Sequence, residues 1–289
     1  MVRLSVGKEK LLEDVTLRKK CMRRKKANVE KHNTKIAIVF FIFVIAIVLT
    51  SLIFKAIAVV AQSKFDGSHR FTVSISNSRN LKLISFSPST RSISVLKLDG
   101  EAKKFNISRF LGIPIDGFVK ASFLETNGEV TSLMSGIFFG YKDIKTNLNL
   151  VDIFRLYLLG RTTPLNNIVT LHISNSFESV KVDKIVAKLF KDEEIEKENQ
   201  TVEIINTTLV SGLGGRLARL VTNMGGNVIQ VSTENNSQKK SIIFYNGKKN
   251  YTIEKLSKAL GFLTSEMNKQ SIADITIVVG EDNKDPLSF

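Results

Sequence analysis

The hydrophobic pattern of the chain is dominated by one long apolar run close to its start. Residues 36–54 are nineteen positions of Ile, Val, Phe, Ala and Leu with one Thr and one Ser, and a shorter apolar stretch follows Lys55 as far as Ala61. As a helix, the longer run spans roughly 28 Å, about the thickness of a bilayer's hydrocarbon core. We therefore predict a transmembrane helix over residues 36–61. A buried soluble helix or a cleaved signal peptide fits less well, because the run has no polar stripe and only a poor small-residue cleavage site.

Beyond this run, residues 62–191 alternate short β-like segments with turns and then place apolar residues at helical spacing. The pattern predicts strands over residues 70–75, 81–86 and 92–98, a hairpin turn at residues 88–90, and helices over residues 149–159 and 181–190. We expect a mixed α/β region here.

An acidic run separates this region from the rest of the chain. Residues 192–198 read Asp-Glu-Glu-Ile-Glu-Lys-Glu, and such a run is usually solvated. We therefore predict a linker at residues 192–198 and a new domain after it. Residues 283–289, which follow the last predicted strand, are interpreted as a frayed tail.

The pattern between these two segments, over residues 199–282, predicts a compact domain. Strands are expected over residues 201–205, 227–233, 241–245 and 272–279, and helices over residues 211–224 and 252–260, each followed by glycine. The order β-α-β-β-α-β is typical of a two-layer unit with both helices on one face of a sheet. The whole chain is therefore predicted to be an α+β protein behind an N-terminal transmembrane helix.

The net charge of +15 is concentrated before the apolar run. Residues 1–35 contain twelve Lys and Arg against four acidic residues. Basic residues that precede a first transmembrane helix resist translocation, so residues 1–35 are expected to form a cytoplasmic tail and the later domains to lie outside the cytoplasm. The lipid bilayer is the expected partner of this tail; nucleic-acid binding is the alternative and is not expected.

Cysteine and histidine are too scarce to support a metal site. The chain has one cysteine, Cys21, in the predicted tail, and three histidines, His32, His69 and His172, with no pair at metal-ligand spacing. The glycine-rich segment at residues 212–215 lacks both the dinucleotide fingerprint and the Walker lysine. We expect neither a metal nor a cofactor.

The C-terminal segment resembles a known family. The run Val-Glu-Ile-Ile-Asn that ends at Asn206, the glycines that begin at Gly212, the helix that contains Arg216 and the closing Gly-Glu-Asp at residues 280–282 resemble the LytR C-terminal domain over residues 199–282. The resemblance implies an envelope protein that binds cell-wall polymer or an envelope protein partner. We consider Asn206, Gly212, Arg216 and Tyr245 as candidate ligand-binding residues, since a helix N-terminus attracts anions and an aromatic ring can flank a groove.

The predicted hairpin over residues 81–97 and the run Leu-Gly-Ile-Pro-Ile-Asp-Gly-Phe-Val at residues 111–119 carry a second resemblance. Through them, residues 62–191 resemble, in degenerate and shortened form, the LytR-CpsA-Psr domain that often precedes this family and transfers glycopolymers from a lipid pyrophosphate to the cell wall. Where that family carries Pro-Arg-Asp, this chain has Leu-Lys-Leu around Lys97, and too few residues follow for the family's arginine-rich loop. Pyrophosphate chemistry requires clustered arginines and carboxylates that hold a divalent cation. Catalytic residues therefore cannot be assigned, and Arg109, Asp116, Lys142 and Arg161 are interpreted as solvated surface.

Three functional hypotheses follow. The favoured one is a non-catalytic, single-pass bacterial cell-envelope protein whose exported C-terminal domain binds wall material or an envelope partner. The alternatives are a divergent glycopolymer transferase, which would be a phosphotransferase, and a scaffold for envelope assembly, which an exposed apolar patch would favour.

Overall fold

The structure is a computed structural model that describes residues 18–19, 22, 35, 38–77, 80–98, 107–124, 128–173, 179–267 and 271–283. The chain divides into two compact units, residues 1–61 and residues 62–289. Most of the predicted cytoplasmic tail, and all but the first residue of the predicted C-terminal tail, lie outside the described residues.

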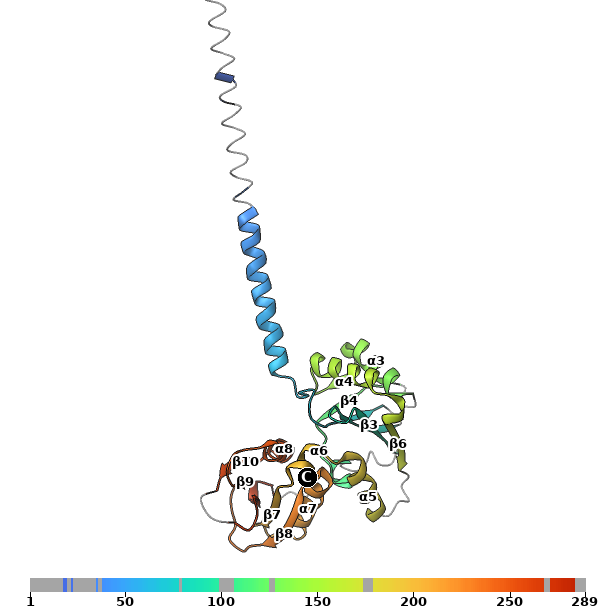
Figure 1. Cartoon of the computed structure of the whole chain (residues 1–289), viewed down its shortest axis with the longest axis vertical. Coiled ribbons are helices and arrows are strands. Elements are labelled where there is room, and N and C mark those ends of the chain that lie inside the picture. The colour runs from blue at the N-terminus through green and yellow to red at the C-terminus, as the bar shows by residue number, and fades with distance from the viewer. Residues whose placement is uncertain are drawn as a thin grey trace, which may run out of the picture. The chain divides into compact units, whose positions relative to one another are not determined.

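The first unit contains the predicted apolar helix. It runs over Ile38–Ala61, and its side chains make no buried core. Figure 1 shows it as a single uninterrupted blue ribbon. Its length and composition are those of a membrane-spanning helix.

The second unit begins with a six-stranded sheet in the order β5-β4-β1-β2-β3-β6. The strands are β1 (Phe71–Ser76), β2 (Leu81–Ser87), β3 (Ser92–Leu98), β4 (Gly117–Lys120), β5 (Lys145–Thr146) and β6 (Ile168–Ile173). Strands β1, β2 and β3 form an antiparallel meander that contains the predicted hairpin, while β4 and β6 add in parallel at either side. Strands β4, β5 and β6 were not predicted, because each is short or mostly exposed along its length.

Helices cover both faces of this sheet. Helices α3 (Val130–Phe139) and α4 (Leu150–Thr162) pack on one face, and α2 (Ile107–Leu111) and α5 (Ser179–Phe190) pack on the other (Figure 1). Helix α4 begins at a capping box, in which Asn149 and Asp152 each accept from the other's backbone N–H at 2.9 Å. The short helical turns η2 (Tyr141–Asp143) and η3 (Leu165–Asn167) flank α4.

The segment predicted as a solvated linker is instead a packed helix. Helix α6 (Glu193–Glu198) begins at Asp192, which accepts from the Glu194 N–H at 3.1 Å, and buries Ile195 in the core of the following domain. The prediction was wrong because the acidic side chains have partners far away in the sequence. Arg70 pairs with Glu193, and two backbone N–H groups near residue 251 donate to Glu198.

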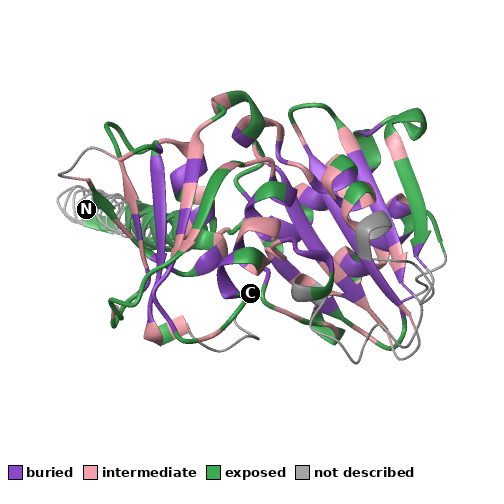
Figure 2. Cartoon of the chain, turned by 90° about the horizontal axis from the view of Figure 1, so that it is seen from below, coloured by how far each residue is buried: buried purple, intermediate pink, exposed green. Residues whose placement is uncertain are grey.

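The C-terminal part of this unit is a five-stranded sheet in the order β10-β9-β11-β7-β8. Its elements are β7 (Thr201–Asn206), α7 (Leu213–Met224), β8 (Asn227–Thr233), β9 (Ile242–Tyr245), α8 (Tyr251–Leu260), β10 (Leu263–Glu266) and β11 (Ile275–Val279), followed by the turn η4 (Glu281–Asn283). Both helices share one core on one face of the sheet, as predicted. Figure 2 shows that the central strands of both sheets are buried.

Strand β10 is the element that the predicted order lacked. It pairs in parallel with β9, so the domain consists of two β-α-β units, β7-α7-β8 and β9-α8-β10, joined by β11. Its sequence, Leu-Thr-Ser-Glu, buries no residue fully and so shows no apolar periodicity. The predicted helix ends are confirmed: Gly225 and Gly261 both take left-handed C-cap conformations, with φ of 104° and 72°.

Candidate functional site

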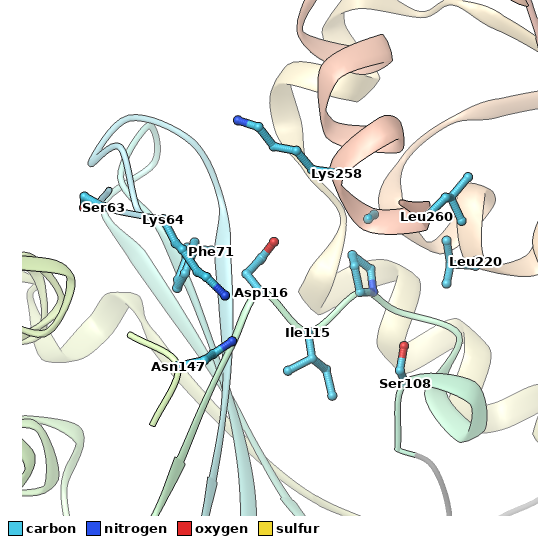
Figure 3. Close-up of a pocket in the computed structure, with 12 residues that line it drawn as sticks. Ser63, Lys64, Phe71, Ser108, Ile115, Asp116, Asn147, Leu220, Lys258 and Leu260 are labelled. Carbon is cyan, nitrogen blue, oxygen red and sulfur yellow. The ribbon is translucent and has the colours of Figure 1, made fainter. Parts of the chain in front are cut away.

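The main cavity of the second unit lies between its two sheets and has a volume of about 580 Å³. The first sheet and the segment before it contribute Ser63, Lys64, Phe71, Asp116 and Asn147, and the C-terminal domain contributes Leu220, Lys258 and Leu260. In Figure 3, Lys64 and Asp116 extend from one wall and Lys258 from the opposite helix, around the same open space. We name this cavity the inter-sheet cleft.

Asp116 is held at the base of the cleft by both its backbone and its side chain. Its N–H donates to the Thr72 carbonyl at 2.9 Å, and its Oδ2 accepts from the Thr72 N–H at 2.8 Å. From helix α8, the Lys255 ammonium donates to Asp116 Oδ1 at 2.8 Å and to the Arg70 carbonyl at 3.1 Å. The interpretation of Asp116 as solvated surface was therefore wrong, because its side chain is only 19% exposed and is neutralised across the cleft.

The two other lysines of the cleft have no such partner. Lys64 and Lys258 are exposed, and among the described residues neither has a carboxylate within ion-pair distance. Since Lys255 neutralises Asp116, Lys64 and Lys258 leave the described walls of the cleft with a positive potential. Such a cleft attracts an anionic ligand.

A partly buried polar network lies beside Lys255. The Tyr251 hydroxyl donates to Asp192 Oδ2 at 2.7 Å, and the His69 ring stacks on Tyr251 at a centroid distance of 3.9 Å. Burial raises the pKa of Asp192 despite this hydrogen bond, and burial together with the Asp192 carboxylate raises the pKa of Tyr251. Tyr251 therefore stays protonated as a donor, and the network fixes α8 against the first sheet.

A second set of bonds joins the two halves along helix α7. The Arg219 guanidinium forms an ion pair with Asp183 and donates to the Phe110 carbonyl at 2.8 Å, and Asn223 Nδ2 donates to the Leu111 carbonyl at 3.1 Å. The walls of the cleft are thus held by polar contacts on both sides, and its opening is largely pre-formed.

The cleft offers binding groups but no activated nucleophile among its described residues. The Ser63 hydroxyl donates to Asp152 Oδ1 at 2.5 Å, with the Phe65 carbonyl at 3.0 Å as the alternative acceptor, and the Ser108 hydroxyl donates to the Ile113 carbonyl at 2.6 Å. Over the part of the chain that the structure describes, no three His, Cys, Asp or Glu side chains come together as metal ligands. The arrangement can hold an anion by charge and hydrogen bonds.

The four residues predicted to bind ligand lie outside this cleft. Asn206 is buried and organises its own turn, since its Nδ2 donates to the Val210 carbonyl and its Oδ1 accepts from the Thr208 N–H and hydroxyl. Gly212 caps helix α7 in a left-handed conformation next to Arg216. Tyr245 ends strand β9 and packs partly buried against the domain core.

The Arg216 side chain has unused hydrogen-bond donors, because its Nε and Nη2 are buried and have no hydrogen-bond partner among the described residues. The structure thus brings Gly212 and Arg216 together at the start of α7 and places Tyr245 apart from them, at the end of β9. A ligand role for all four residues stays a prediction.

Sequence reasoning missed Lys64, Lys258 and the pair of Asp116 with Lys255. No local signal marks them, since they come together only when the two sheets pack.

A second basic feature lies on the first sheet. Lys82 and Lys97 are direct neighbours across strands β2 and β3, and Lys97 is also the neighbour of His172 on β6. Lys82 is 3% exposed and donates to the Gly128 carbonyl at 3.3 Å. Burial, together with the charge of Lys97, lowers the pKa of Lys82 to about 8.

Comparison with known proteins places the C-terminal domain in a family. Residues 199–282 match the model of the family described as LytR cell envelope-related transcriptional attenuator, at its C-terminal domain. No curated protein matches the chain.

Several solved structures are similar to part of the chain. The transcriptional regulator yvhJ from Bacillus subtilis is 12% identical over 42% of this chain and 97% of its own, with a TM-score of 0.34. TagV from Bacillus subtilis is 10% identical over 43% and 97%, with a TM-score of 0.33, and the Lin1025 protein from Listeria innocua is 8% identical over 42% and 97%, with a TM-score of 0.33. Similarity at this level carries no argument about activity.

Proposed function

We propose that this chain, whose residues 199–282 form a LytR C-terminal domain, is a non-catalytic, single-pass membrane protein of the bacterial cell envelope that binds an anionic envelope polymer outside the cytoplasm. The domain family supports the cell envelope, and the helix Ile38–Ala61 supports the membrane anchor. The basic residues before that helix favour a cytoplasmic N-terminus.

One observation carries the binding role. The inter-sheet cleft presents Lys64 and Lys258 from opposite walls without carboxylate partners among the described residues, and its one lining carboxylate, Asp116, is neutralised by Lys255 (Figure 3). Wall polymers that carry phosphates or carboxylates offer repeated anionic groups to such a site. The polar contacts on either side of the cleft hold it open, so that little ordering is required on binding.

The proposal is tested by retention of the detergent-solubilised full chain on purified cell wall, with and without its attached anionic polymers. We expect saturable binding that needs the polymers, weakens with salt, and falls about tenfold in the double variant Lys64→Ala/Lys258→Ala. The matched control is Lys248→Ala/Lys249→Ala, which removes two exposed lysines outside the cleft. Equal binding by both double variants would exclude the cleft.

The same assay separates the candidate residues of the C-terminal domain. If Arg216→Ala and Tyr245→Ala weaken retention while the cleft variant does not, the ligand lies against the domain surface rather than in the cleft. If the chain is not retained at all, the envelope-protein partner becomes the favoured ligand.

The transferase alternative is favoured by the pair Lys82 and Lys97. Lys97 stands where the resembling family carries an arginine, and its neighbour Lys82 adds a second cation at the same end of the sheet. Two cations can bind a pyrophosphate, although lysine lacks the bidentate fork of arginine. If the purified chain transferred the phospho-glycopolymer from a lipid-pyrophosphate donor to a wall acceptor and released the lipid monophosphate, and Lys97→Ala lost this release, the result would support this alternative over simple binding.

A further inference from the structure

Helices α3 and α4 expose an apolar face on the side away from the first sheet. On α4, Leu150, Phe154 and Leu158 follow one another at intervals of four residues and are 47%, 44% and 41% exposed. On α3, Phe139 is 79% exposed, and Phe123 just before that helix is 49% exposed. A solvated helix face normally carries polar residues at these positions.

These side chains form one continuous patch. The Phe138 ring lies between the two helices, with ring centroids 5.3 Å from Phe139, 5.6 Å from Phe154 and 5.4 Å from Tyr157, on which it stacks. Phe123 packs on Gly140 at the end of α3, where an added Cβ would come within 2.7 Å of its ring. We name the surface formed by Phe123, Phe138, Phe139, Leu150, Phe154 and Leu158 the aromatic face.

The charge around the aromatic face is mainly basic. The one acidic residue in α4, Asp152, is fully buried, whereas Arg161 on the exposed side is solvated near the end of the helix. Lys142 and Lys145 are exposed between α3 and α4, and the exposed acids are Asp143 in the same segment and Glu129 at the start of α3, so basic residues remain in excess. An apolar aromatic surface with a basic border fits the interface of an anionic bilayer.

The segment that directly follows the apolar helix in the sequence is bonded to α4. That helix ends at Ala61, and only two residues later the Ser63 hydroxyl donates to Asp152 Oδ1 in the first turn of α4 at 2.5 Å. The Phe65 N–H donates to the same oxygen at 2.8 Å, and Arg155 donates to Ser63 at 3.2 Å and to the Phe65 carbonyl. Two residues of extended chain reach about 7 Å, so Ser63, whose side chain contacts α4, is tethered within that distance of Ala61.

We propose that the aromatic face docks on the outer surface of the bilayer, with the rings of α3 and α4 in the headgroup region. The proposal rests on the proposed membrane anchor. Because Asp152 and Arg155 tie the segment after the anchor to α4, docking requires little extra ordering once the anchor is inserted. The docked state sets the inter-sheet cleft at a fixed height above the membrane.

The test uses the absence of tryptophan from the chain. Single variants of the full chain, each in nanodiscs of phosphatidylcholine and phosphatidylglycerol with one copy per disc, report on their surroundings through quenching by brominated lipid. Phe154→Trp probes the aromatic face, Phe43→Trp probes the anchor, and Leu209→Trp, at a position 99% exposed in the C-terminal domain, is the solvent control. Leu158→Trp is a second probe that does not replace a ring in contact with Phe138.

We expect Phe154→Trp and Leu158→Trp to be quenched at least about half as strongly as Phe43→Trp, and Leu209→Trp to remain unquenched. Quenching of Phe43→Trp alone would overturn docking while the anchor stands. An unquenched Phe43→Trp would overturn the anchor and docking together. A blue-shifted but unquenched Phe154→Trp would also overturn docking on lipid, because it would show that protein covers the aromatic face.

Discussion

Asp116 Oδ1 lies 2.8 Å from Lys255 Nζ, which is the ion pair that connects the first sheet to helix α8 of the LytR C-terminal domain. Both side chains are mostly buried, at 19% and 12% exposed. A half-buried charge that loses its partner keeps the cost of desolvation without the compensating attraction.

Lys255→Ala is therefore expected to lower the free energy of unfolding by about 2 kcal/mol, through the unpaired Asp116 carboxylate. Urea unfolding of the detergent-solubilised chain, followed by circular dichroism, measures this change. Lys248→Ala, at an exposed lysine, serves as the control and should remain within about 0.5 kcal/mol of the wild type. Similar stabilities of the two variants would show that the ion pair contributes no net stability.

Gly214 and Gly215 offer a matched pair in the first turn of α7. A Cβ on Gly214 would come within 3.0 Å of Val231 Cγ1 on strand β8, whereas a Cβ on Gly215 would meet nothing within 4 Å. Gly214→Ala is expected to destabilise the protein by about 1–2 kcal/mol, and Gly215→Ala to stabilise it by about 0.5 kcal/mol through helix propensity. Thermal unfolding of the two variants in parallel checks the opposite signs.

Glu198 caps helix α8 from outside that helix. Its two carboxylate oxygens accept from the Tyr251 N–H at 3.1 Å and from the Thr252 N–H at 2.8 Å, where the helix begins. Glu198→Ala should cost about 1–2 kcal/mol, since it leaves two helix N-terminal donors without an acceptor. Hydrogen exchange of those two amides should accelerate in this variant, and Lys197→Ala, one residue earlier and 77% exposed, should leave their exchange unchanged.

The lowered pKa of Lys82 predicts that the stability of the folded chain depends on pH between about 8 and 10.5. Its pKa in the folded chain, about 8, is lower than the ordinary 10.5, so between these values the unfolded chain holds a proton that the folded chain lacks. Between pH 8 and 10.5 the free energy of unfolding therefore rises with pH, by at most about 1.4 kcal/mol per pH unit. Below pH 8 Lys82 is charged in both states, and the folded chain bears the full cost of burying that charge.

Lys82→Met should consequently be more stable than the wild type at pH 7, and the difference should shrink as the pH rises toward 10. Urea unfolding of both proteins at several pH values between 7 and 10 tests this expectation. Lys97→Met removes the neighbouring charge and should shrink the difference in part, because burial remains. A difference that does not change with pH would show that Lys82 titrates normally.

Short-range sequence patterns correctly predicted the strands and helices that carry a clear apolar periodicity and a turn or glycine at their ends. The meander of β1, β2 and β3 has alternating apolar residues and a turn after residue 87, and helices α7 and α8 have apolar residues at helical spacing with glycine after the last turn. The match of residues 199–282 to its family confirmed the resemblance carried by the same motifs.

The remaining features depend on residues that are distant in sequence. The acidic residues of α6 looked solvated because their partners are distant in the sequence: Arg70, which neutralises Glu193, lies 123 positions away, and the start of α8, which Glu198 caps, lies about 53 positions away. Asn206 was predicted to bind ligand, a role that stays a prediction, and the structure adds that its amide completes its own turn through local bonds to Val210 and Thr208. Lys64 and Lys258 become neighbours of one cleft only through the packing of two sheets, which composition and periodicity do not encode.

The place of β11 has a consequence for synthesis. This strand follows the other four strands of its sheet in the sequence but lies in the middle of that sheet, where it pairs with β7 on one side and with β9 on the other. A nascent chain that has been made only as far as residue 266 holds two β-α-β halves with no strand between them, each with an open edge. The sheet can close only after residues 275–279 have left the ribosome, so until then chaperones and proteases meet an unfinished sheet.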